Sequence, residues 1–126
     1  MRYFICSLKE IFLGISAEQT EQIIQLNDVQ NIDQKAGAIL SCISPAELFK
    51  LNDINNLHGL ILKSCSQEKT IIAVPKIETD LDIPDEKIQK LPQILCTLLW
   101  FIKGCYFNES KLILIINEKD ITGMNK

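Results

Sequence analysis

The sequence predicts a mainly β chain folded into small barrels or a sandwich, and two observations lead to this class. About eight to ten short apolar runs, many alternating with polar residues, are separated by turns about every eight to twelve residues. No long amphipathic stretch is available as a crossover helix, which argues against an α/β fold. With 126 residues, 47% of them apolar, the chain is long enough to bury a core as one domain, 1–126.

The segment 69–92 organises this prediction. Residues 71–74 form a β-rich apolar run, and apolar residues then alternate with polar ones through position 83. Pro75 has no amide donor and therefore indicates a bend or a sheet edge. We expect a strand that crosses from one small sheet to another and ends in a charged turn between Pro84 and Pro92.

The remaining elements follow from the same pattern. The first two strands form a hairpin around Lys9-Glu10, although this pair suits a tight hairpin turn poorly. A polar loop is expected over 27–35, a hairpin connection over 65–68 and a terminal turn or helix over 117–121. Strands are expected at 3–8, 11–15, 20–26, 36–43, 57–64, 69–74, 98–107 and 111–116.

The segment Ser44-Pro45-Ala46-Glu47 is the clearest helix start. Serine is a favoured N-cap residue, and proline has the backbone angle of the first helical position. Glu47 is placed to reach back to the Ser44 amide, which would complete a capping box. A short helix is expected to follow and to end at residues 52–53.

Charge and hydropathy limit the classes of partner. The net charge is −3 and the isoelectric point is near 5.1, so no electrostatic feature favours nucleic acid or an anionic membrane. The longest apolar run, 94–102, is shorter than the ~20 residues of a membrane-spanning helix. No signal peptide is expected, and the chain is predicted to be cytoplasmic.

The cysteine pattern favours neither a zinc site nor a disulfide framework. No two cysteines are closer than nine residues, and their total is odd. We expect reduced, buried thiols that act as small hydrophobic side chains. The five are Cys6, Cys42, Cys65, Cys96 and Cys105.

The sequence offers no catalytic, cofactor or metal site. His58, the single histidine, has no partner at a useful spacing and is expected at a surface or turn position. The acidic set lacks the glycine and the spacing of a calcium loop, so a solvated strand face is expected. That set consists of Glu78, Asp80, Asp82, Asp85 and Glu86.

Several segments, taken in order, resemble the CheW-like domain family of bacterial chemotaxis. No single motif among them is specific, and the resemblance is carried by their order along the chain, which includes a Phe101-Ile102-Lys103-Gly104 step and an apolar strand leading into Asn117. The segments that carry the resemblance are 71–77, 82–92, 101–104 and 110–121, with weaker likeness at 3–14 and 22–24.

The resemblance implies two five-stranded SH3-like barrels packed together with a groove between them, divided into intertwined subdomains at roughly 20–75 and the remainder. It implies a non-enzymatic adaptor that couples a histidine kinase to the cytoplasmic tip of chemoreceptors. It also places Ile39, Cys42 and Ile43 at a coupling surface, with a place in the core as the alternative. Trp100 and Phe101 would face opposite sides of a strand, so one could anchor a partner unless both are core.

The chain also departs from the family pattern. The Arg-Gly step tied to coupling is missing from 37–48, and Arg2 is the only arginine. Pro75 and Asn117 stand where the family has aspartates. These departures motivate a second hypothesis, a self-associating structural or regulatory β-barrel, such as a homodimer, that has lost coupling. A third, a small enzyme or ligand carrier, would need a closed cavity with converging polar groups.

Overall fold

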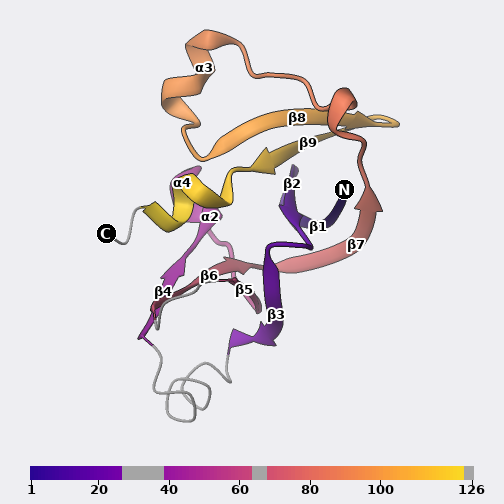
Figure 1. The fold of residues 1–126 in the computed structure, drawn as a ribbon. Coiled ribbons are helices and arrows are strands. Elements are labelled where there is room, and N and C mark those ends of the chain that lie inside the picture. Colours follow the sequence, from indigo (N-terminus) through magenta and orange to yellow (C-terminus); the bar gives the residue numbers. More distant parts are fainter. Residues whose placement is uncertain (27–38, 64–67, 124–126) are drawn as a thin grey trace.

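The computed structural model describes residues 1–26, 39–63 and 68–123. These residues form two β-sheets with short helical segments beside and between them (Figure 1), so the mainly β prediction is confirmed. The strands are β1 (Arg2–Leu8), β2 (Ile11–Ser16), β3 (Thr20–Gln25), β4 (Ile39–Ile43), β5 (His58–Leu62), β6 (Glu68–Val74), β7 (Lys76–Asp82), β8 (Ile102–Asn108) and β9 (Lys111–Ile116). The helical segments are α2 (Pro45–Leu48), the 3-10 turn η2 (Asp85–Lys87), α3 (Gln93–Leu98) and α4 (Glu118–Gly123).

One sheet has five strands in the order β7-β1-β2-β9-β8. Two hairpins, β1–β2 and β8–β9, lie side by side because β2 and β9 pair in parallel. Each hairpin has a two-residue loop whose first residue has a positive φ, 57° at Lys9 and 58° at Glu109. The hairpin predicted around Lys9-Glu10 is therefore present, and in both loops ordinary residues occupy a backbone region that glycine or asparagine would fill more easily.

The five-stranded sheet closes on itself through a bridge between its two edges. After β7, the chain crosses to β8, where Gln89 N donates to Cys105 O and Cys105 N donates to Gln89 O, both at 2.8 Å. The inside of this closed sheet is filled by a buried cluster. Its members are Tyr3, Ile5, Ile83, Ile113 and Ile115.

The other sheet has four strands in the order β3-β5-β6-β4. The pairs β3–β5 and β5–β6 are antiparallel, and β4 pairs with β6 in parallel. The described residues thus give four strands here, where the sequence resemblance implied five. All of them lie between Thr20 and Val74. The division into two subdomains stays a prediction.

Pro75 marks the point at which the chain leaves one sheet and enters the other. Val74 pairs with His58 in the four-stranded sheet, and Lys76 pairs with Ser7 in the five-stranded sheet. The missing amide of proline is tolerated because the pairing changes at this position. The predicted crossing of segment 69–92 is confirmed, and β7 becomes an edge strand.

The largest core cluster lies between the two sheets. Leu8, Leu13 and Ile15 from the β1–β2 hairpin are completely buried in it. They pack in one cluster with Leu60 and with other side chains of the four-stranded sheet. The members from that sheet are Ile43, Leu60, Leu62, Ile72 and Val74. Since both sheets contribute to one cluster, the space between them is filled.

Two sequence predictions about helices were wrong in part. The helix after Ser44 is present, but no side chain caps it; instead Ser44 Oγ accepts a hydrogen bond of 2.9 Å from Asn56 Nδ2. The predicted strand at 98–107 begins only at Ile102, and α3 precedes it. A continuous apolar run does not distinguish helix from strand, which explains the second error. The predicted loop 27–35, residues 36–38 and most of the connection 65–68 lie outside the described residues.

Candidate protein-interaction surface

The predicted coupling residues on β4 occupy different environments. Ile43 is 9% exposed and belongs to the core between the sheets, whereas Cys42 is exposed. The backbone of Ile39 pairs with Glu68 at the start of β6. Its side chain lies outside the described residues. Ile43 therefore lies in the core, which was the alternative to a place on the coupling surface. That β4 binds a partner stays a prediction.

Trp100 and Phe101 lie in the turn between α3 and β8, so the expected strand placement was wrong. Phe101 is 1% exposed and packs edge-on against Phe49, with ring centroids 5.2 Å apart. Trp100 is 37% exposed, and its ring centroid lies 5.4 Å from that of Phe101. One aromatic is core and its neighbour reaches the surface, which leaves Trp100 available to a partner.

Helix α3 carries the most exposed large apolar side chains among the described residues. Ile94 is 80% exposed and Leu98 is 72% exposed, and no residue of the helix is buried. Leu91 and Leu99, just before and after the helix, pack against the core between the sheets. The helix is therefore held at both ends while its outer side faces solvent, above β8 in Figure 1. We call Ile94, Leu98 and Trp100 the α3 patch.

The sequence contained a signal for this helix. Leu91, Leu95 and Leu99 follow one another at intervals of four, and all three are half-buried. Such spacing is typical of one face of a helix. The run is apolar at nearly every position. This hides the spacing of four and explains why a strand was expected there.

A second apolar area lies where the two hairpins meet. Phe107 and Leu112 are cross-strand partners and are 58% and 42% exposed. A shallow pocket of ≈ 330 Å³ beside them is lined in part by Phe12, Lys111 and Leu112. Lys111 Nζ lies 4.9 Å from the centroid of the Phe12 ring. Glu10 also lines the pocket, so this surface groove has both apolar side chains and charges of both signs.

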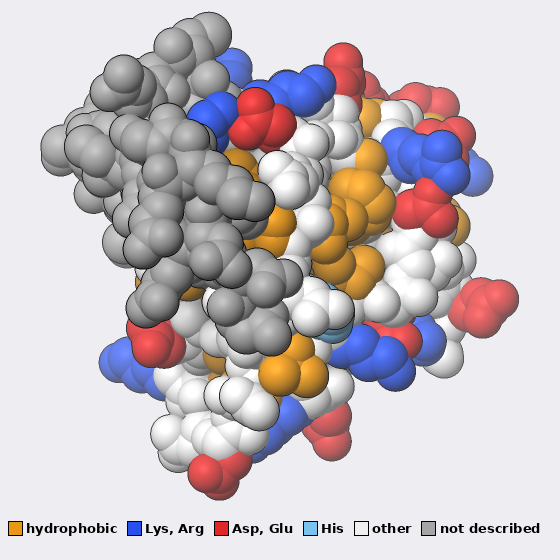
Figure 2. Space-filling model, turned by 90° about the horizontal axis from the view of Figure 1, so that it is seen from below, with side chains coloured by type: hydrophobic (Ala, Val, Ile, Leu, Met, Phe, Trp, Pro, Cys, Tyr) orange, Lys and Arg blue, Asp and Glu red, His pale blue; other side chains and the backbone are white. Residues whose placement is uncertain are grey.

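The face of the four-stranded sheet is more mixed. Figure 2 shows it from below, with hydrophobic side chains reaching the surface among charged side chains of both signs. Ile23 and Leu57 are 42% and 54% exposed. A shallow pocket of ≈ 410 Å³ is lined by Leu57 and its neighbours. His58 also lines this pocket, at the start of β5, which is the expected surface or turn setting.

The acidic residues of β7 form a solvated edge, as predicted. Asp80 pairs with Arg2, and Glu78 lies 3.5 Å from Lys76 Nζ. The hydrogen bond of 2.8 Å that Ser7 Oγ donates to Glu78 lowers the pKa of that carboxyl, with a further contribution from nearby Lys76. In the described part of the chain, no group of three or more His, Cys, Asp or Glu side chains could hold a metal ion.

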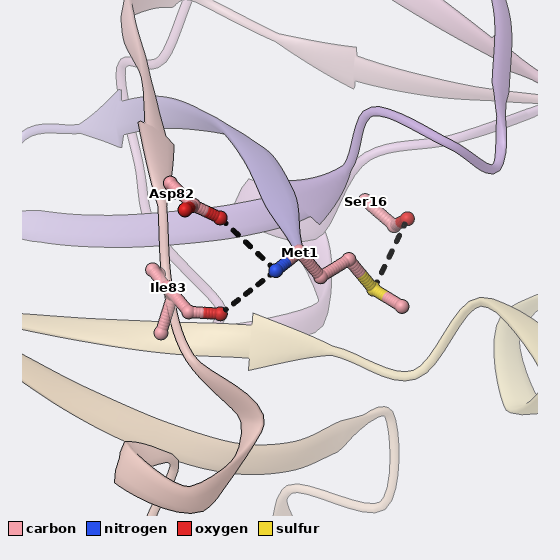
Figure 3. A network of polar contacts seen from close by, with 4 residues as sticks. All are labelled: Met1, Ser16, Asp82 and Ile83. Atoms are coloured by element: carbon pink, nitrogen blue, oxygen red, sulfur yellow. Dashed lines mark hydrogen bonds and ion pairs between the residues drawn. The ribbon is translucent and has the colours of Figure 1, made fainter.

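The N-terminal residue is bonded to the end of the edge strand β7. The Met1 amino group donates to Asp82 Oδ1 at 3.0 Å and to the Ile83 carbonyl at 3.2 Å (Figure 3). Ser16 Oγ lies 4.0 Å from the Met1 sulfur in the same view. These contacts fasten the start of the chain to the end of β7.

The cysteines only partly match the expectation of buried thiols. Cys6 is completely buried, and burial raises the pKa of its thiol to about 12, with a smaller contribution from Glu78. Cys42 and Cys96 are exposed, so the prediction was wrong for both. Burial of part of the Cys42 side chain and nearby Glu47 raise the pKa of that thiol. All four described cysteines are free.

The two packed sheets and their short helices define a CheW-like fold, which confirms the fold implied by the sequence resemblance. Among solved structures, the chain is similar to the crystal structure of the scaffolding protein TtCheW from Thermoanaerobacter tengcongensis. The match has a TM-score of 0.70 at 16% sequence identity and covers 92% of this chain and 83% of that chain. No family model and no curated protein matches the sequence. Among the described helices, none has the length and apolar character needed to cross a bilayer.

Proposed function

We propose that this chain is a non-enzymatic signalling adaptor of the CheW type, which couples a histidine kinase to chemoreceptors through protein–protein contacts in the cytoplasm. The observation that carries the proposal is the shared fold with a scaffolding protein over 92% of the chain. The exposed apolar side chains support it, because surfaces of this kind are typical of binding sites. A scaffold needs no catalytic residues, and the sequence suggested none.

The lost Arg-Gly step supports an alternative, a self-associating β-barrel that no longer couples a kinase to a receptor. The two functions make different demands on the apolar surfaces. An adaptor must keep at least two surfaces free for different partners. A homodimer buries the same patch on both copies.

The test of the adaptor function is direct binding to the chemotaxis kinase encoded in the same genome. The purified chain is titrated against the C-terminal regulatory part of the kinase and against a soluble cytoplasmic receptor fragment, by calorimetry. Binding with a Kd of about 50 μM or tighter to the kinase is expected, which corresponds to about 6 kcal/mol. No heat and no co-elution at that concentration would contradict coupling.

Sedimentation velocity decides between the two candidates. An adaptor is expected to sediment as a monomer across the concentration range of the binding experiment. A tight homodimer that fails to bind kinase would favour the self-associating alternative. A monomer that binds kinase would exclude it.

A further inference from the structure

We infer that a pocket at one end of the five-stranded sheet binds a small zwitterion, a molecule with one carboxylate and one ammonium group, as free amino acids and short peptides have. The inference goes beyond the adaptor function and does not depend on it. The pocket has a volume of ≈ 320 Å³, in the lower part of the range of about 300–1,000 Å³ for small-molecule sites. Side chains that line it include Ser16, Lys103, Asn117 and Glu118.

The pocket lies where the parallel strands β2 and β9 end side by side. Gly14 pairs with Ile115, so Ser16 at the end of β2 lies close to the start of α4. Glu118, the first residue of α4, accepts a hydrogen bond of 3.0 Å from Ser16 N through its Oε1. This bond holds the carboxylate in place. Its other oxygen can still accept a hydrogen bond from an ammonium group in the pocket.

Lys103 on β8 supplies the positive charge. Its Nζ lies 5.6 Å from the centroid of the Tyr3 ring, which is completely buried and therefore a fixed support. Tyr3 is also the cross-strand partner of Ser16. Within the described part of the chain, no carboxylate forms an ion pair with Lys103. The pocket therefore has a cation from β8 and an anion from α4 that do not neutralise each other.

A buried hydroxyl group provides the third contact. Ser16 is 2% exposed, and its Oγ donates to Met1 Sδ at 4.0 Å (Figure 3). A thioether sulfur is a weak acceptor, so a carboxylate oxygen would be a stronger partner for this hydroxyl. The arrangement assigns the carboxylate of the ligand to Lys103 and Ser16, and its ammonium group to Glu118.

The charges argue against a ligand that has charge of only one sign. A dicarboxylate would be repelled by Glu118, and a diamine would be repelled by Lys103. The Met1 amino group also lines the pocket, but it is already bonded to Asp82. Lys119 is an exposed part of the lining and adds positive charge, which makes a dianion the main competing ligand.

The first experiment titrates the isotope-labelled chain with four zwitterions, alanine, β-alanine, γ-aminobutyrate and dialanine, and follows the amide signals by NMR. At least one is expected to shift the Ser16, Lys103 and Glu118 amides saturably, with a Kd of about 1 mM or tighter. Propionate lacks the ammonium group and ethylamine lacks the carboxylate. Each should bind at least tenfold more weakly than the best zwitterion, because one charge-assisted hydrogen bond is lost.

The second experiment repeats the titration with two variants. Glu118→Gln removes the charge but keeps a side-chain oxygen for Ser16 N, and Lys103→Met keeps an apolar chain of similar length. Circular dichroism checks the fold of both, and each should weaken the best zwitterion at least tenfold. The matched control is Lys111→Met, because Lys111 Nζ lies over the Phe12 ring and does not line this pocket. A change below about twofold is expected for the control.

Three outcomes would overturn the inference. The first is no saturable shift with any of the four zwitterions, or equal affinity for propionate or ethylamine. The second is tighter binding of succinate or inorganic phosphate, which would assign the pocket to dianions. The third is unchanged affinity in either charge variant. None of these measurements involves the kinase, so the proposed adaptor function is tested separately.

Discussion

At the residue scale, burial and not local sequence decides what each cysteine can do. Cys6 lies on β1 among the side chains of the core between the sheets, and its thiol is protected from water. Cys96 lies in an equally apolar stretch of sequence, yet it is exposed because it lies on the solvent side of α3. The two thiols therefore differ in environment although their sequence contexts look alike.

Burial of Cys6 predicts a specific loss of stability at high pH. The thiol has a pKa of about 12 in the folded chain and an ordinary value of 9.0. The folded state therefore keeps the proton while the unfolded chain releases it, so the stabilisation is complete below pH 9 and is lost between pH 9 and 12. The unfolding free energy should fall there by up to about 1.4 kcal/mol per pH unit from this group.

Urea unfolding at several pH values tests this prediction in parallel with Cys6→Ala. The variant lacks the titrating thiol, whereas the tyrosines and lysines titrate in both proteins. A steeper decline with pH is expected in the unsubstituted chain. Identical slopes would show that the Cys6 thiol does not contribute.

At the scale of elements, the closure of the five-stranded sheet depends on a glycine. An added Cβ at Gly104 would lie 2.7 Å from the carbonyl oxygen of Gln89 and 2.6 Å from Cγ2 of Ile88. Both positions belong to the segment that bridges to β8. A backbone oxygen has little freedom to move, so the bridge must open to accept a side chain here.

Gly104→Ala is therefore expected to destabilise the fold by about 1–3 kcal/mol, the usual cost of overpacking. The amides of Gln89 and Cys105, which form the bridge, should lose protection in hydrogen exchange. The control is Ser110→Ala in the exposed loop of the same hairpin, with an expected change within about 0.5 kcal/mol. Unchanged protection of the two amides in Gly104→Ala would contradict the role of the bridge.

At the scale of the whole molecule, the two sheets share one core. The largest buried cluster contains side chains from both sheets and from the turn that holds Phe101. Neither sheet can lose its partner without exposing these side chains to water. We therefore expect the described sheets to unfold in a single cooperative transition.

Leu62→Ala tests this expectation. Leu62 is 2% exposed on β5, and truncation of a buried leucine costs about 2–5 kcal/mol. Trp100 lies next to the five-stranded sheet, so its fluorescence should report the same lowered midpoint as circular dichroism. Leu112→Ala, at a 42% exposed position, is the control with a small expected change. Two separate transitions would contradict a shared core.

The sequence by itself determined most of the strands, the first hairpin and the crossing at Pro75, because alternating side chains and a missing amide act locally. It also placed the helix start at Ser44, although the hydroxyl bonds to Asn56 instead of the helix. Only the tertiary structure decided that Phe101 is buried while Trp100 is exposed, and that Ile94 and Leu98 face solvent. These outcomes depend on how the segment from Leu91 to Leu99 packs against the core. Because this segment is apolar at nearly every position, apolar character alone does not show which of its sides faces the core.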